Sequence, residues 1–270
     1  MAKTVAPAIT GYEALEKAIV GLITPPYSSN LQSKPFYAHF IKNCEREFTK
    51  DIPTLGVYVT DKVHLVINED FFVSMTTLER IAVLEHEILH LVMTHLTRFK
   101  PKYHKIWNIA CDMAINQYIP NLPKTAVTHQ QFKLQAEKEA EFYYRELIKK
   151  AKKDPNSCQG EGEGREGQLP GNPDTIDDHK IWDKSNSNKD LSKAVVKGAI
   201  QQSIKNIKDY GNLPGAVQVE LNRLLKEDMV NWKRELNKFI NQATIVRMAM
   251  TGSVQIVGTL NMKGIRTSIA

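Results

Sequence analysis

The feature that most constrains this chain is a pair of histidines four residues apart, His86 and His90. Around them, apolar residues recur at intervals of three and four, which is the pattern of an amphipathic α-helix. Thr76 and Glu79 have the spacing of a capping box, so we predict a helix that begins there and continues to about Phe99. Two side chains four apart on a helix point the same way, about one turn apart. The two imidazoles can therefore reach the same point in space.

Glu87 completes a His-Glu-x-x-His arrangement, whose metal-binding chemistry has a physical basis. Imidazole nitrogens coordinate Zn2+ at about 2.1 Å, and a carboxylate beside the first ligand can hold and deprotonate a metal-bound water. Ile81, Leu84 and Ile88 mark an apolar side of the predicted helix, and the histidines lie roughly opposite. This pattern indicates an embedded helix whose histidines face a metal. The alternative is a pair of surface histidines on a solvated helix face.

A catalytic zinc site needs a third protein ligand and an open position for water. The extended motif with a glycine and a third histidine does not occur, because Met93 and Leu96 stand at those positions. His95 falls on the apolar side of the predicted helix, so we interpret it as a core residue or a support for the ligands. His104 follows Pro101 in the next connection and has no further feature in its favour.

The best candidate for the third ligand is Asp112, in a helix that we predict over about residues 105–118. Asn108, Asp112 and Asn116 are spaced four apart and form one polar stripe on an otherwise apolar helix. Asp112 follows His90 by 22 positions, which leaves room for an antiparallel return, and thermolysin-like zincins take a carboxylate ligand from a second helix at a similar offset. The asparagines would then hydrogen-bond Asp112 or a ligating histidine. The alternative is an aspartate that caps or bridges other polar groups.

The rest of the chain predicts a mostly helical α+β fold with a small β-hairpin or sheet beside the metal helix. Alternating apolar residues at 54–68 predict the hairpin. Residues 154–175 interleave glycine with glutamate and predict a flexible acidic loop. We predict one domain over residues 1–242 and a β-leaning C-terminal tail over 243–270. Helical spacing covers residues 12–22, a short stretch from Pro35, 135–150, 191–207 and 217–240.

Composition and charge exclude several classes of protein. Hydrophobic residues make up 42% of the 270 residues and charged residues 24%, which is typical of a globular domain and not of a disordered chain. No apolar run approaches the ~20 residues of a membrane helix, and no signal peptide is recognisable, so we expect a cytoplasmic protein without a membrane partner. The net charge of +6 is scattered, so nucleic acid as a partner has only weak support.

Two stretches carry a resemblance to a known family: residues 86–95, which begin His-Glu-Ile-Leu-His, and residues 107–117, which include Cys-Asp-Met-Ala-Ile-Asn. They are similar to the putative metallopeptidase domain of bacterial and phage proteins, which precedes a von Willebrand A-like domain in longer members. Supporting pieces bring the resemblance to about residues 12–239; they are Pro35-Phe36, the hairpin ending at Asn68, Ala140–Leu147, Asp178-His179-x-x-Trp182 and 211–239.

This resemblance implies a zincin-like fold, with zinc held by His86, His90 and Asp112 and with Glu87 as catalytic base. If a phage encodes the chain, the expected location is the host cytoplasm. His179 is a weaker catalytic candidate. It could stabilise the oxyanion that develops on a scissile carbonyl, act as a fourth metal ligand, or be an ordinary loop residue.

These observations together predict a zinc-dependent metallopeptidase that acts on a peptide or protein substrate. One alternative is a non-catalytic zinc-binding scaffold or adaptor protein. Another is a nucleic-acid-associated protease recruited by its basic charge, and salt-dependent DNA binding would identify it. The sequence does not predict the substrate or the oligomeric state.

Overall fold

The computed structural model describes residues 9–27, 29–98, 101–153, 179–185, 188–205, 207 and 211–226. The predicted loop at 154–175 and the predicted tail at 243–270 lie outside these residues. The chain divides into a unit Met1–Leu225 and a unit Lys226–Ala270, and almost all of the described residues belong to the first. The predicted domain boundary after residue 242 therefore stays a prediction.

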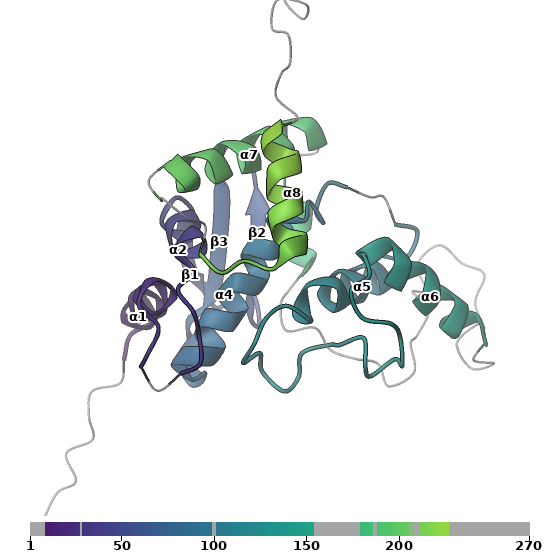
Figure 1. Ribbon diagram of the computed structural model, residues 1–270, viewed down its shortest axis with the longest axis horizontal. Helices are drawn as coiled ribbons and strands as arrows, with labels where there is room; N and C mark the ends of the chain where they lie inside the picture. The colour runs from purple at the N-terminus through teal and green to yellow at the C-terminus, as the bar shows by residue number, and fades with distance from the viewer. Residues whose placement is uncertain are drawn as a thin grey trace, which may run out of the picture. The chain divides into compact units, whose positions relative to one another are not determined.

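The described part of the first unit is mostly helical and contains one small sheet (Figure 1), which agrees with the predicted α+β class. Its elements, in chain order, are α1 (Gly11–Ile23), α2 (Pro35–Lys42), β1 (Glu45–Thr49), β2 (Leu55–Val59), β3 (Val63–Asn68), α3 (Glu69–Ser74), α4 (Thr77–Val92), α5 (His104–Asn116), α6 (Ala140–Lys153), the 3-10 helix η1 (His179–Lys184), α7 (Lys189–Lys205) and α8 (Gly215–Lys226).

The sheet has the strand order β1-β3-β2 and contains the predicted hairpin. β2 and β3 pair antiparallel, with Val57 opposite Leu65, and the alternating apolar side chains of both strands are buried. β1 pairs parallel with β3 and was not predicted, because Phe48 is the only large apolar residue among its five. β2 is therefore an edge strand, and it contacts both α4 and η1.

α4 carries the histidine pair and is surrounded by protein. The predicted capping box is confirmed: Thr76 Oγ1 accepts from the Glu79 N–H at 3.3 Å, and the Glu79 carboxylate accepts from the Thr76 N–H at 2.9 Å. α1, α2, β2, α5 and α7 all contact α4, and every residue from 80 to 92 is buried. Gly21 allows the close approach of α1, because an added Cβ there would lie 2.7 Å from Ile81 Cδ1.

α4 ends at Val92, so the prediction that this helix continues to about residue 99 is wrong. The Thr94 N–H donates to the Leu91 carbonyl and the His95 N–H donates to the His90 carbonyl, both at 3.0 Å, which is a Schellman motif. Thr94 has a φ of 55° in the left-handed position of this motif, where glycine is usual and a β-branched residue is strained. Because no glycine marks the end, apolar periodicity alone predicted a longer helix.

Buried apolar side chains of the described residues form two large clusters. The first contains the apolar faces of α1, α2 and α4, the inner face of the sheet, and residues of α7 and α8. The second joins α5 to α6, where the Trp107 ring packs edge-on against the Tyr144 ring. α6 begins at Ala140 and not near residue 135, since Glu137 has a φ of 55° that a helix does not permit. α4 therefore lies in the first cluster and most of the apolar side of α5 in the second, while Ile115 near the end of α5 joins the first.

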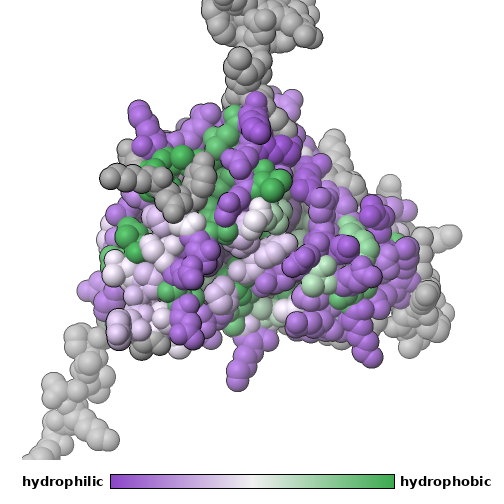
Figure 2. All heavy atoms as spheres, in the orientation of Figure 1, coloured by the Kyte–Doolittle hydropathy of each residue, from purple (hydrophilic) through white to green (hydrophobic). Residues whose placement is uncertain are grey.

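None of the helices among the described residues is long and apolar enough to cross a membrane. On the face drawn in Figure 2, apolar residues are scattered among hydrophilic ones.

A buried ion pair joins Lys34 to Glu85 of α4. Lys34 Nζ lies 2.6 Å from Glu85 Oε2, and both side chains are buried. Burial raises the pKa of Glu85, while the Lys34 charge opposes that rise. We expect Lys34→Met to lower the free energy of unfolding by about 3–5 kcal/mol, because it leaves a buried carboxyl without its cation.

Urea unfolding followed by circular dichroism measures this loss. The matched control is Lys149→Met, which removes an exposed ion pair with Glu146 and should leave the midpoint nearly unchanged. A similar midpoint for the two variants would contradict the structural role assigned to the Lys34 pair.

Candidate metal centre

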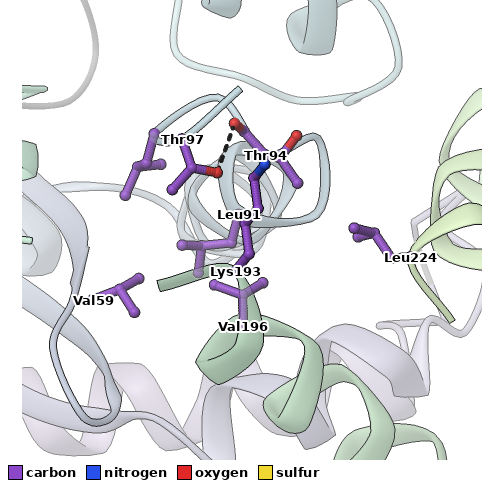
Figure 3. Close-up of a pocket in the computed structure, with 8 residues that line it drawn as sticks. Val59, Leu91, Thr94, Thr97, Lys193, Val196 and Leu224 are labelled. Carbon is purple, nitrogen blue, oxygen red and sulfur yellow. Dashed lines mark hydrogen bonds between the residues drawn. The ribbon is translucent and has the colours of Figure 1, made fainter. Parts of the chain in front are cut away.

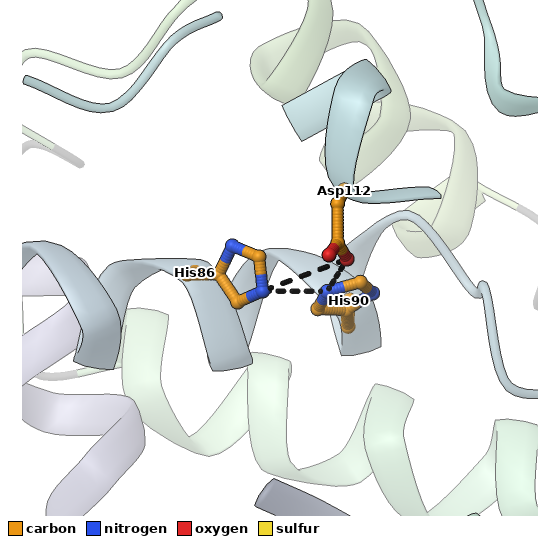
Figure 4. A group of neighbouring side chains, drawn as sticks. All are labelled: His86, His90 and Asp112. Carbon is orange, nitrogen blue, oxygen red and sulfur yellow. Dashed lines mark hydrogen bonds and ion pairs between the residues drawn. The ribbon is translucent and has the colours of Figure 1, made fainter. Parts of the chain in front are cut away.

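Three polar side chains converge between α4 and α5. His86 and His90 come from adjacent turns of α4, and Asp112 reaches them from the middle of α5 (Figure 4). The two imidazole Nε2 atoms lie 3.0 Å apart, and Asp112 Oδ1 lies 3.8 Å from His86 Nε2 and 3.4 Å from His90 Nε2. All three side chains are buried, so the alternative of two histidines on a solvated face is wrong.

This donor set fits a small divalent metal ion. Zinc binds imidazole nitrogen and carboxylate oxygen at about 2.0–2.2 Å, so neighbouring ligand atoms of a tetrahedral site lie about 3.4 Å apart. The three measured separations, 3.0, 3.4 and 3.8 Å, lie on both sides of that value. Among the described residues, His86, His90 and Asp112 are the group of His, Cys, Asp or Glu side chains that could hold a metal. Three protein ligands leave a fourth position for water or substrate.

Asn116 fixes the orientation of the first imidazole. Its amide Nδ2 donates to the Val127 carbonyl at 2.7 Å, so its Oδ1 is the atom that faces His86 Nδ1, also at 2.7 Å. An amide oxygen only accepts, and therefore His86 Nδ1 carries the hydrogen and His86 Nε2 presents a lone pair toward Asp112. The prediction that an asparagine of the α5 stripe would bond a histidine is thus confirmed for Asn116. Asn108, two turns earlier, is half-buried.

His95 lies beside the second imidazole, which agrees with its interpretation as a support for the ligands. The helical pattern had placed His95 on the apolar side of a longer helix. The Schellman turn instead brings it back to α4, where its Nδ1 lies 3.1 Å from His90 Nδ1 and its side chain is buried. The sequence did not predict the left-handed conformation of Thr94, because nothing in the neighbouring residues indicates a turn there.

Trp182 also contacts the His90 ring. The two rings are inclined at 64° with their centroids 5.1 Å apart, and Trp182 is half-buried. It belongs to η1, which packs against β2 and buries Ile181 beside Val66. Sequence reasoning had selected this stretch for His179 and not for its tryptophan. His179 begins the same 3-10 helix, but its side chain lies outside the described residues.

The remaining candidates have these positions. Glu87 is fully buried next to His86. His104 is exposed at the first residue of α5, eight residues or about 12 Å along the helix from Asp112. Tyr143 and Tyr144 lie in the second apolar cluster, and their hydroxyl groups bond the backbone at Gln135 and Tyr103. The two tyrosines are therefore part of the core.

A pocket among the described residues lies beside the end of α4 and not at the histidines (Figure 3). Leu91 and Thr94 of the α4 terminus line it together with Val59, Val196 and Leu224. Its volume of about 10 Å³ is at the lower limit for a single water molecule. It is too small and too apolar to be a substrate site.

Comparison with known proteins supports a metal-dependent role. The sequence model of a family described as a putative metallopeptidase domain matches residues 29–249. An uncharacterized protein of Thermotoga maritima is 32% identical over 117 residues, which is 42% of this chain and 27% of that protein. The match thus spans about a quarter of the relative's length. No solved structure matches the chain.

The converging triad predicts how metal content responds to mutation. Purified protein should hold about one zinc per chain. Asp112→Ala should lose the zinc, because only two of the three protein ligands remain in that variant. Asn108→Ala changes another polar residue of α5 and should keep the zinc. Metal analysis after purification without chelator and zinc add-back measures both contents. Equal zinc in the two folded variants would exclude Asp112 as a ligand.

Proposed function

The chain belongs to the putative metallopeptidase domain family, and from this we propose that it is a zinc-dependent metallopeptidase that hydrolyses peptide bonds. The observation that carries the proposal is the convergence of His86, His90 and Asp112 at separations that suit a tetrahedral site. The Glu87 carboxylate stands one residue from the first of these groups, where a hydrolase needs a base.

Each residue has a separate task in the proposed mechanism. His86 and His90, through Nε2, and Asp112, through its carboxylate, would hold the zinc. A bound zinc ion supplies polarisation of the substrate carbonyl and lowers the pKa of water. Glu87 accepts the proton of the attacking water and later returns it to the leaving amine. Its burial beside the ligands keeps competing bulk water away from this proton transfer.

His179 enters the proposal through its place in η1. His179 is the first residue of this 3-10 helix, and Trp182 of the same helix contacts His90. If the helix brings the His179 imidazole to the substrate, this side chain would stabilise the negative charge that develops on the scissile carbonyl oxygen. We also propose a zincin-like fold, supported by a metal helix that contacts an edge strand and by a carboxylate from the following helix.

Glu87→Gln tests the proposed base. The amide is nearly isosteric with the carboxylate but cannot accept a proton, so we expect zinc content and fold to persist while hydrolysis falls by about 10²–10⁴-fold or more. Digestion of a peptide library, read by mass spectrometry, measures the rate. The control is Glu79→Gln, since glutamine also completes a capping box and should leave hydrolysis unchanged. Undiminished, chelator-sensitive cleavage by Glu87→Gln would assign the base to another group.

A second candidate function is a non-catalytic zinc-binding scaffold, and one observation favours it. His86, Glu87, His90 and Asp112 are all 0% exposed, so a peptide reaches them only if covering residues move. Trp182 is one such residue, because its ring lies on His90 while its helix η1 packs on β2. A metallopeptidase must open at this point, whereas a structural zinc centre stays closed.

Trp182→Ala tests access to the centre. Removal of the indole should expose one side of His90, so we expect a chelator to extract zinc faster from the variant than from the natural protein. Absorbance of a coloured chelator measures the extraction rate. Tyr58→Ala is the control, because Tyr58 packs in the same small cluster as η1 but stacks on His64. Equal rates for both variants would show that Trp182 does not limit access.

A further inference from the structure

His95 has a contact that a core histidine does not need. Its Nδ1 lies 3.1 Å from Nδ1 of His90, the ring nitrogen that points away from Asp112. A ligating imidazole binds metal through one nitrogen and is oriented by the hydrogen bond of the other. His86 already has such an outer partner in Asn116. His95 stands in the corresponding position for His90.

The backbone around His95 holds it firmly in place. Its N–H donates to the His90 carbonyl at 3.0 Å, and its own carbonyl accepts from Trp107 Nε1 at 3.4 Å. The first bond comes from α4 and the second from α5, so both helices that supply the metal-binding triad also fix His95. The ring is buried beside His90, with the two planes inclined at 70°.

Thr94 gives an independent indication, because it is strained. A β-branched residue at a φ of 55° costs about 1–3 kcal/mol, and such a conformation persists only where its surroundings enforce it. This conformation turns the chain at the end of α4 and brings the following residue back to His90. A glycine would allow the same turn without strain, so the turn does not require a threonine. The consequence of the turn is that the His95 imidazole lies beside His90.

We propose that His95 is a positioning residue of the metal centre. It holds the His90 ring with the hydrogen on Nδ1, so that Nε2 keeps its lone pair directed at Asp112 and at the metal. In the metal-bound protein His90 Nδ1 donates and His95 Nδ1 accepts, which places the hydrogen of His95 on Nε2. The proposal rests on the metal centre described above but not on peptide hydrolysis.

Zinc-loaded natural protein gives the first test. Long-range proton–nitrogen NMR spectra distinguish the two tautomers of each histidine. We expect a protonated Nδ1 on His90 and a protonated Nε2 on His95. A protonated Nδ1 on His95 in the loaded protein would overturn the proposal, and this measurement requires no variant to fold.

Cobalt titration of the metal-free variants gives the second test. His95→Phe keeps a ring but has no nitrogen, so we expect its Co2+ affinity to fall about 10–100-fold and its visible cobalt spectrum to shift. His95→Gln restores a hydrogen-bonding side chain and should recover most of the affinity. His104→Phe, at the exposed start of α5, is the matched control and should bind like the natural protein.

The outcomes separate this proposal from the metal centre itself. If the natural protein binds neither Co2+ nor Zn2+, the metal centre fails. If the natural protein binds and His95→Phe binds equally well, the positioning role fails and His95 is a core residue only. Should His95→Phe not fold, His95→Leu is read in the same way, and the NMR result decides if neither variant folds.

Discussion

The interaction on which the structure depends is the meeting of two imidazoles and a carboxylate between α4 and α5. Three polar groups that are entirely shielded from water would destabilise a fold if nothing compensated them. Compensation comes from mutual contact and from outer partners, Asn116 on one imidazole and His95 on the other. The surrounding architecture serves this arrangement: α4 is enclosed on every side, and α5 presents its polar stripe to α4 while its apolar side packs on α6.

Local signals in the sequence predicted a large part of this arrangement. A capping box, a 3.6-residue period and a histidine pair describe α4 without any knowledge of the fold. The polar stripe of α5 pointed to Asp112, because a carboxylate on an otherwise apolar helix requires a buried partner. The hairpin followed from strict alternation of apolar residues. In each case the physical cause lies within about fifteen residues of chain.

The features that were missed have causes distant in sequence. β1 is too polar to show a strand pattern, and it forms because β3 offers a parallel edge. Thr94 adopts a left-handed conformation that its residue type disfavours, so only tertiary contacts explain it. Trp182 reaches His90 from a short 3-10 helix some 90 positions later, and no periodicity relates the two. Thr94 and Trp182 are both next to the metal centre, where local preferences and the requirements of a site most often disagree.

The separation of the apolar side chains into two clusters has a consequence for folding. α4 lies in one cluster and most of the apolar side of α5 in the other, Ile115 links α5 to the first, and buried polar groups lie at the junction. The junction contains buried polar groups and therefore gains less from the hydrophobic effect than either cluster does. A metal at the junction ties both helices together and stabilises only the state in which both clusters are complete. Zinc would therefore act on cooperativity as well as on stability, because it would strengthen the link between the two clusters.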